Sequence, residues 1–343
     1  PLFLAMLRSE TAASPERQAA ALPGLAAYQA ALRPPRPEPA PVAFAAGRAA
    51  LRDYGGDGAP VVFVPSLINP PLILDLAHEN SLLRWLSGQG LHPYLLDWGE
   101  PGPDERDLDV TGHVEQLLLP LLARFDRPPL LVGYCLGGTM ALAAASIAPV
   151  AGVATIAAPW RFAGYGDALG DMRRLWDSAE PLCAQLGLVP MEVLQSGFWQ
   201  LDPARTVAKY EAFAAMEPES DQARAFVALE DWANAGAPLT YEAGRQLFYD
   251  FLTADLPGTG GWTVAGMATG PDALRCPGIE FVSLTDRIVP AATAAGLTER
   301  RDTGAGHVGM VVGSRGRSQL WEPLRDWLLG CKLQGPSNQG TDQ

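Results

Sequence analysis

The stretch Gly133-Tyr134-Cys135-Leu136-Gly137-Gly138 lies between two apolar runs and decides the fold. It has the Gly-x-nucleophile-x-Gly form of a sharp strand-to-helix turn, with cysteine in the place of the nucleophile. Glycine suits the flanking positions because the chain passes so close to its neighbours there that a Cβ would clash. The helix that follows places unpaired N–H groups and its positive dipole end beside the sulfur, which favours the thiolate. The motif therefore predicts a reactive Cys135 at the end of a buried strand.

The composition is that of a globular protein with a large core, since 48% of the 343 residues are hydrophobic and 18% are charged. A net charge of −13 argues against non-specific binding to nucleic acid or to an anionic membrane. The uncharged run 128–160 is as long as a membrane span, but its glycines and prolines favour a strand, a helix and a second strand.

The cysteines show no CxxC pair and no regular spacing; they are Cys135, Cys183, Cys276 and Cys331. A disulfide framework or a zinc site is therefore not expected, and neither a metal nor a cofactor is predicted. Cysteine usage of this kind is typical of a reducing compartment, so we expect the protein in the cytoplasm.

Apolar strands alternate with helical patterns over most of the chain. The predicted strands are 61–65, 92–97, 130–132, 152–156, 279–284 and 299–302. The predicted helices are 80–89, 111–124, 139–147, one beginning at Pro290, and 314–329. This order predicts an α/β fold, with a mostly parallel sheet and helices on both of its faces.

The remaining segments interrupt that alternation. Residues 1–54 are expected to form an N-terminal helical segment and a proline-rich linker. Residues 55–160 and 271–331 are then the α/β core. Residues 161–270 carry mostly helical patterns and are expected to form a helical cap over the sheet, and the polar residues 332–343 a disordered tail.

A nucleophile on such a turn needs an acid and then a histidine later in the chain. Asp286 follows the predicted strand 279–284, at the carboxyl end where such sheets place functional residues. His307 lies in a glycine-rich loop further on and would be the general base, with Asp286 fixing its tautomer. Asp302 is nearer to His307 in sequence and is a rival acid, but it falls before the loop.

The cysteines and histidines also have simpler, purely structural explanations. A buried, inert Cys135 would be the default without its flanking glycines, and the other cysteines are expected to be packing residues. The remaining histidines precede the nucleophile and are expected to be surface or structural residues; they are His78, His92 and His113. Backbone N–H groups would form the oxyanion hole, one from Leu136 and one from Leu67 in the loop after the first core strand.

Several motifs recur together in one known family. They are Pro65-Ser66-Leu67-Ile68-Asn69, Ile73-Leu74-Asp75-Leu76, Asn80-Ser81-Leu82, Leu95-Leu96-Asp97-Trp98-Gly99, the Cys135 turn, Phe226-Val227-Ala228-Leu229-Glu230-Asp231-Trp232 and Gly306-His307-Val308-Gly309. In this combination the chain resembles the polyhydroxyalkanoate synthases over roughly residues 55–330, and its short length resembles the class III catalytic subunit.

The resemblance implies an α/β-hydrolase core under a helical cap, and an acyltransferase that polymerises 3-hydroxyacyl-CoA with release of CoA. It implies that Cys135 carries the acyl chain, that His307 is the base and that Asp286 is the acid. It further implies homodimers that act at the surface of polyester granules with an accessory subunit. One position departs from the family, which commonly has histidine where this chain has Arg287.

Cysteine suits such a reaction, because a thiolate exchanges readily with a thioester when the two sulfurs are of similar basicity. Two other interpretations remain open. The chain could be a thioesterase or a polymer depolymerase that uses the same residues with water as the acceptor. It could also be a catalytically silent granule-binding or interaction protein that keeps the fold.

Overall fold

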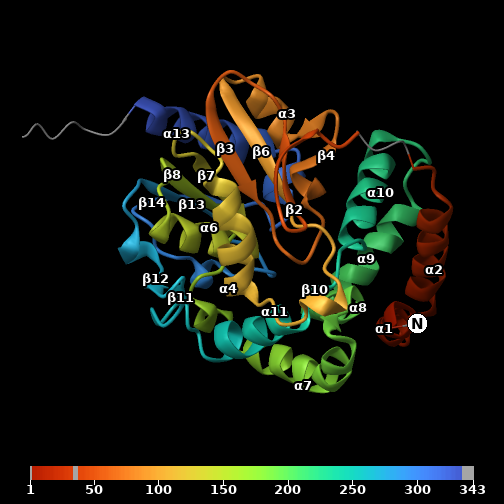
Figure 1. Ribbon diagram of the computed structural model, residues 1–343. Coiled ribbons are helices and arrows are strands. Elements are labelled where there is room, and N and C mark those ends of the chain that lie inside the picture. Colours follow the sequence, from red (N-terminus) through yellow and green to blue (C-terminus); the bar gives the residue numbers. More distant parts are fainter. Residues whose placement is uncertain (1, 34–37, 334–343) are drawn as a thin grey trace, which may run out of the picture.

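A computed structural model describes residues 2–33 and 38–333. Its centre is a sheet of eight strands in the order β1-β2-β6-β3-β7-β8-β13-β14 (Figure 1). Their bounds are β1 (Val42–Ala46), β2 (Ala49–Asp53), β3 (Ala59–Val64), β6 (Leu91–Asp97), β7 (Leu130–Tyr134), β8 (Gly152–Ile156), β13 (Gly278–Ser283) and β14 (Glu299–Thr303). From β6 to β14 neighbouring strands are parallel, whereas β1 and β2 pair antiparallel at one edge.

Both faces of the sheet are covered, which confirms the predicted α/β fold. Successive side chains of β3 enter different cores, with Val62 and Val64 in one and Val61 and Phe63 in the other. The first core includes α6 (Leu136–Ile147) and a helix that runs from α4 (Val110–Gly112) to α5 (Leu119–Leu122), π-wound over His113–Leu118. The second core includes α3 (Leu82–Ser87), α12 (Gly309–Val312) and α13 (Glu322–Leu333). Strands buried on both faces explain the continuous apolar runs of the sequence.

Three expectations about local structure are wrong. Residues 42–53 were expected within the N-terminal helical segment and linker, but they form β1 and β2 and belong to the sheet. The helix expected from Pro290 is a single 3₁₀ turn, Ala291–Thr293. The helix expected over 80–89 begins only at Leu82, because Ser81 caps it by accepting from the backbone N–H of Arg84. Residues 80–81 instead form β5 (Asn80–Ser81), paired with β4 (Asp75–Ala77).

Other parts of the chain follow the expectation, depart from it only at a boundary, or cannot be compared with it. The N-terminal helical pattern consists of two helices, α1 (Leu2–Thr11) and α2 (Pro15–Ala30). The expected start of the tail at residue 332 is wrong, because α13 continues to Leu333. The proline-rich residues 34–37 and the tail residues 334–343 lie outside the described part of the chain.

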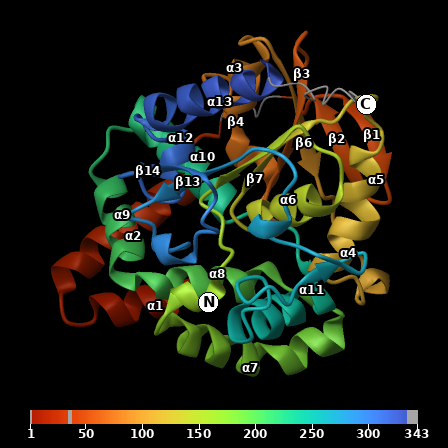
Figure 2. The same ribbon diagram turned by 90° about the vertical axis from the view of Figure 1, so that its left-hand side faces the viewer.

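A layer of helices lies between β8 and β13 in sequence and covers the carboxyl end of the parallel strands. It consists of α7 (Ala168–Leu186), α8 (Met191–Leu201), α9 (Pro203–Ala214), α10 (Asp221–Ala233) and α11 (Tyr241–Arg245), which continues as a π-wound helix Gln246–Thr253. We refer to these elements as the cap helices. Two-residue strands also occur here, β9 (Leu188–Val189) paired with β10 (Leu239–Thr240) and β11 (Thr263–Val264) paired with β12 (Met267–Ala268). Figures 1 and 2 show α7, α8 and α11 on the side of the molecule opposite α3.

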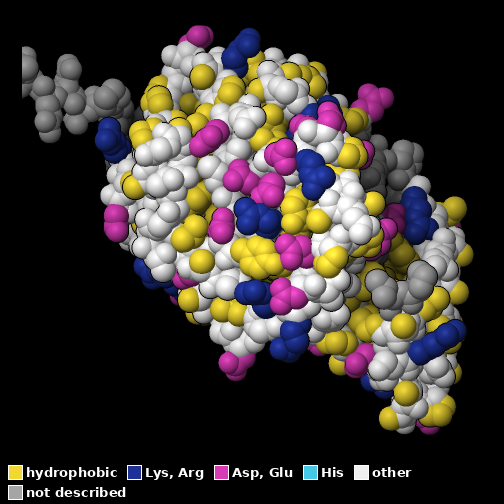
Figure 3. Space-filling model, turned by 60° about the horizontal axis from the view of Figure 1, so that its bottom comes forward, with side chains coloured by type: hydrophobic (Ala, Val, Ile, Leu, Met, Phe, Trp, Pro, Cys, Tyr) yellow, Lys and Arg dark blue, Asp and Glu magenta, His cyan; other side chains and the backbone are white. Residues whose placement is uncertain are grey.

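The N-terminal helices pack against the cap helices and not against the sheet (Figure 1). The hydroxyl of Tyr28 donates to Asp231 on α10 at 2.7 Å, and Arg17 pairs with Glu211 on α9 at 3.0 Å. Acidic and basic side chains are interspersed over the side of the molecule seen in Figure 3. No helix within residues 2–33 or 38–333 is long and apolar enough to span a membrane.

Candidate active site

Cys135 occupies a strained turn between β7 and α6. Its backbone has φ 55° and ψ −133°, a region that residues with a side chain rarely adopt. The predicted reason for the flanking glycines is confirmed. A Cβ at Gly133 would overlap the backbone of Gly138, and a Cβ at Gly137 would overlap the carbonyl oxygen of Val64. The turn thus holds the sulfur at the carboxyl end of the central strand and at the N-terminus of a helix.

Asp286 and His307 lie together, as their predicted roles require. The carboxylate Oδ2 of Asp286, just after β13, accepts from Nδ1–H of His307 at 2.7 Å, and both residues are buried. The other carboxylate oxygen accepts from the backbone N–H groups of Ile288 at 2.8 Å and Val289 at 2.9 Å. These donors fix the carboxylate, which in turn fixes the tautomer and the orientation of the imidazole ring.

The charges around His307 favour its protonated form. Burial alone lowers the pKa of this imidazole, but the charges of Cys135 and Asp286, with hydrogen bonds to both, raise it well above the ordinary 6.5. Because Asp286 accepts from Nδ1, Nε2 is the ring nitrogen left to exchange a proton with Cys135. Tyr134 packs against the imidazole with ring centroids 5.0 Å apart, and its hydroxyl donates to the backbone carbonyl of His307 at 3.4 Å. The arrangement can therefore move a proton between a sulfur and the imidazole.

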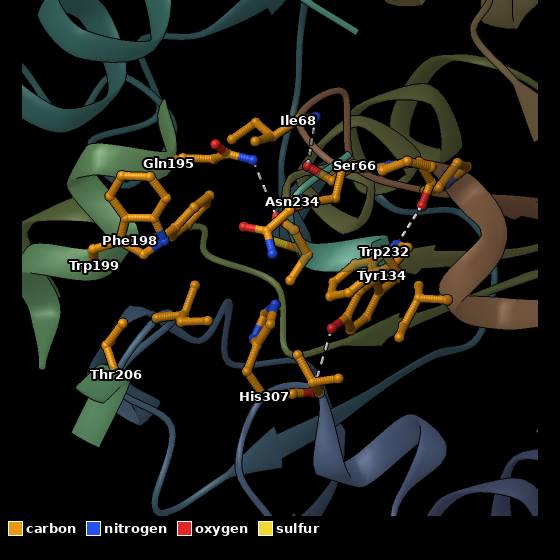
Figure 4. A pocket seen from close by; sticks show the side chains of 18 of the residues that line it. Ser66, Ile68, Tyr134, Gln195, Phe198, Trp199, Thr206, Trp232, Asn234 and His307 are labelled. Atoms are coloured by element: carbon orange, nitrogen blue, oxygen red, sulfur yellow. Dashed lines mark hydrogen bonds between the residues drawn. The ribbon is translucent and has the colours of Figure 1, made fainter. Parts of the chain in front are cut away.

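Two chambers meet at Cys135, and three further residues line both of them: Ile68, Phe198 and Ile288. The smaller chamber has a volume of about 200 Å³ and is lined by His307 and by several polar side chains, among them Asn69, Gln195, Lys209 and Asn234. Figure 4 shows the ring of His307 pointing into this chamber, toward the amide of Asn234. The larger chamber has a volume of about 510 Å³ and a mostly apolar lining.

The predicted oxyanion donors lie close to these chambers. Leu136 is the first residue of α6, where backbone N–H groups have no partner within the helix, and it lines the larger chamber. The side chain of Leu67 is buried in the core, whereas its neighbours Ser66 and Ile68 line the smaller chamber. The use of these two N–H groups remains a prediction.

The alternative candidates lie elsewhere. Asp302 is exposed and pairs with Arg300 at 2.7 Å. His78 is exposed, His92 contacts Asp53 at 2.6 Å, and His113 is buried among structural partners. None of these histidines lines either chamber.

The remaining cysteines and the position that departs from the resemblance also lie outside the chambers. Cys183 is buried in the cap helices, and Cys276 and Cys331 are partly buried. The guanidinium of Arg287 pairs with Asp202, between α8 and α9, and does not line either chamber. Within the described ranges, no group of three or more His, Cys, Asp or Glu side chains could hold a metal ion.

The residues that line both chambers were not predicted from the sequence. Phe198 lies on α8 and Ile288 follows Asp286, and neither belongs to a motif that marks a functional residue. Apolar residues on an amphipathic helix look the same in sequence whether they pack in a core or line a ligand chamber. The only available signal was the position of Ile288 two residues after the predicted acid.

The family model described as the alpha/beta hydrolase family matches residues 61–316, which include Cys135, Asp286 and His307. The chain belongs to the alpha/beta hydrolase family. A monoacylglycerol lipase from Paleococcus ferrophilus has a similar structure, with a TM-score of 0.51 and 14% identity over 83% of this chain and all of that chain. At this identity the likeness shows the fold alone.

Curated relatives are more specific than the family model, and their names confirm the resemblance to polyhydroxyalkanoate synthases. A poly(3-hydroxyalkanoate) polymerase subunit PhaC of Haloferax mediterranei is 29% identical over 300 residues, which cover 82% of this chain and 59% of that protein. The PhaC subunit of Thiocystis violacea is 25% identical over 282 residues, which cover 77% of this chain and 79% of that protein. The chain thus spans about 59% of the length of its haloarchaeal relatives.

Proposed function

We propose that this alpha/beta hydrolase is an acyltransferase that polymerises 3-hydroxyacyl-CoA into polyhydroxyalkanoate. The observation that best supports it is a cysteine at the strained turn beside a His307–Asp286 pair, in a chain whose relatives are named PHA polymerase subunits. With serine in that place, the same turn would fit an enzyme that hydrolyses esters. Cysteine instead favours acyl transfer from CoA, because a thiolate exchanges readily with a thioester.

In the first step, Sγ of Cys135 attacks the thioester carbonyl while His307 holds the thiol proton. The bond from the carbonyl carbon to the sulfur of CoA breaks, and the proton passes from His307 to the departing CoA thiolate. The N–H groups of Leu136 and Leu67 would stabilise the oxyanion between these events. One thioester is exchanged for another, so this step is nearly balanced in free energy.

In the second step, the 3-hydroxyl group of another 3-hydroxyacyl unit attacks the carbonyl carbon bound to Cys135. Nε2 of His307 accepts the hydroxyl proton, the new ester bond forms, and the bond to Sγ breaks. Asp286 stabilises the imidazolium that results. The cap helices cover this end of the sheet, and such a cover limits the access of water, which would otherwise end the chain by hydrolysis.

The test is incubation of the protein with 3-hydroxybutyryl-CoA, following CoA and polymer together. Cys135→Ala is expected to abolish CoA release and the acyl adduct, whereas Cys276→Ala, at a cysteine outside both chambers, is expected to retain them. CoA release that persists in Cys135→Ala would contradict the proposal.

The products separate the remaining alternatives. Free 3-hydroxybutyrate in place of polymer would identify a thioesterase, and release of hydroxy acid from preformed polymer a depolymerase. A chain that forms no acyl adduct would be a silent interaction protein. The proposal extends to homodimers at polyester granules in the cytoplasm and to an accessory subunit, so the incubation is run with and without such a subunit.

A further inference from the structure

The larger chamber is built from one face of each of several cap helices. Ala168, Met172 and Leu175 follow helical spacing on α7, and Leu194 and Leu201 lie on α8. The π-wound helix after α11 contributes further apolar side chains: Leu247, Phe248 and Leu252. The chamber therefore extends from Cys135 outward between cap helices.

A missing side chain keeps this space open. Gly197 lies on α8 and lines the chamber, and a Cβ at this position would come 3.0 Å from Cδ2 of Leu175 on α7. Alanine is the better helix former in a helix interior by about 1 kcal/mol. The glycine therefore weakens α8 in isolation while leaving room between the two helices.

The lining of the larger chamber suits the hydrocarbon part of a proposed substrate better than it suits CoA or the polyester chain. No lysine or arginine is among the described residues that line the chamber, so it offers no partner for the phosphates of CoA. A polyester chain carries a carbonyl group in every repeat, and each one loses hydrogen bonds when it is buried without a donor. An alkyl chain requires no such partner.

The polar side chains of the lining are few and are placed at its ends. Asp171 and Gln200 are exposed and mark the outer end, whereas Tyr165 and Cys135 are partly buried. Asp171 pairs with Arg174 on the surface. Between these ends the chamber offers apolar contacts, and its volume of about 510 Å³ lies in the range that holds drug-sized ligands.

We propose that this chamber binds the alkyl group of the acyl chain on Cys135 and selects medium-chain 3-hydroxyacyl thioesters over four-carbon ones. The proposal rests on the proposed acyltransferase function and names the substrate class for the same site. A four-carbon acyl group leaves most of the chamber without contacts, whereas a ten-carbon group fills it toward Asp171 and Gln200. Each additional buried methylene strengthens binding by about fourfold.

The experiment compares 3-hydroxybutyryl-CoA with 3-hydroxydecanoyl-CoA on the whole chain. Acylation of Cys135 is followed by intact mass and by the rate of CoA release, which gives kcat/KM for each thioester. We expect the ten-carbon substrate to be favoured by at least about tenfold. A preference for the four-carbon substrate, or equal values, would overturn the proposal.

Variants inside and outside the chamber locate the preference. Leu175→Trp fills the chamber, and the ten-carbon to four-carbon ratio of kcat/KM is expected to fall by about tenfold. Gly197→Ala is a second variant that favours the helix, and it is expected to lower the same ratio severalfold. Leu182→Trp is the matched control, since Leu182 is on the same helix but is 55% exposed and outside the chamber, and it is expected to leave both rates unchanged.

The outcomes distinguish this proposal from the proposed function. Acylation of Cys135 by the four-carbon thioester alone overturns the chamber assignment and leaves the acyltransferase in place. Ratios that stay the same in both chamber variants also overturn the assignment. If neither thioester acylates Cys135, the proposed function fails and the chamber assignment fails with it.

Discussion

Two buried histidines, His307 and His113, hold their Nδ1 protons alike but face opposite charges at the other ring nitrogen. His307 donates from Nδ1 to Asp286 at 2.7 Å, and His113 donates from Nδ1 to the backbone carbonyl of Asp109 at 2.6 Å. Nε2 of His307 is the nitrogen left free for Cys135, which lines the same chamber, whereas Nε2 of His113 lies 2.7 Å from the guanidinium of Arg48, which can only donate. His113 is therefore the neutral tautomer with its proton on Nδ1.

The two pKa values move in opposite directions for this reason. Burial, opposed by the hydrogen bond to Asp109 and assisted by the charge of Arg48, lowers the pKa of His113 from 6.5 to about 4. The pKa of His307 rises, because the negative charges of Cys135 and Asp286 outweigh its burial. Burial alone thus does not decide what a histidine can do. The sign of the charge beside the second nitrogen separates the proposed general base from a histidine that serves the fold.

The largest effect is expected from removing the charge that holds His307. Asp286→Asn keeps a side chain of the same shape but removes the carboxylate that fixes the ring and stabilises the imidazolium. We expect acylation of Cys135 to slow by about three to four orders of magnitude, measured as CoA release in a single turnover.

Asp302→Asn is the matched control, because this rival acid is exposed and already pairs with Arg300. It is expected to leave the rate as in the native chain. An Asp286→Asn variant within tenfold of the native rate would contradict the assignment of the acid.

The second histidine is expected to affect the dependence of stability on pH. Between pH 6.5 and about 4 the unfolded chain binds a proton at residue 113 that the folded chain refuses. Stability is therefore lost as the pH falls through this window, by about 1.4 kcal/mol per pH unit and about 3 kcal/mol in all. His113→Gln is expected to remove this contribution, as measured by urea unfolding at several pH values.

The control for this variant is His78→Gln, which replaces an exposed histidine. It is expected to keep the native slope between pH 4 and 6.5. An unchanged slope in His113→Gln would show that His113 is protonated in the folded chain, contrary to the arrangement around Arg48.

The candidate site was readable from the sequence because its constraints are local or follow chain order. The crowding at Gly133 comes from Gly138 in the same turn, whereas Gly137 is crowded by Val64 on a different strand, although the motif itself marks both glycines. The order Cys135, Asp286, His307 follows from the fold once the turn is identified. His113 could be set aside as a base because it precedes the nucleophile. Its pairing with Arg48 spans 65 residues of sequence and has no local signature.

The parts that were missed carry weak or ambiguous patterns. The strands β1 and β2 are rich in alanine, and Val42 and Phe44 are the only β-branched or aromatic residues in them, so the pattern that indicates strands is weak. The chamber lining has the spacing of any amphipathic helix, so the sequence does not distinguish a wall at Gly197 or Leu175 from a core. Only the packing of α7 against α8 makes that distinction.

The smallest effect is expected at Arg287, where the chain departs from the resemblance. Its guanidinium pairs with Asp202, which also accepts from the backbone N–H of Arg205 at the start of α9. The pair therefore links the segment after Asp286 to the junction of α8 and α9. Because the side chain of Arg287 is 63% exposed, Arg287→Gln is expected to lower global stability by less than about 1 kcal/mol.

The effect of this substitution is expected to be local. Loss of the pair should speed amide hydrogen exchange over residues 198–206 without changing exchange in β7 or β13. The double variant Arg287→Asp, Asp202→Arg restores opposite charges and is expected to slow that exchange again, although it lacks the cap of α9. Equal exchange in the native chain and in Arg287→Gln would show that the pair does not hold the cap helices to the sheet. The burial of apolar side chains around Phe198 and Ile288 would then be enough to hold them there.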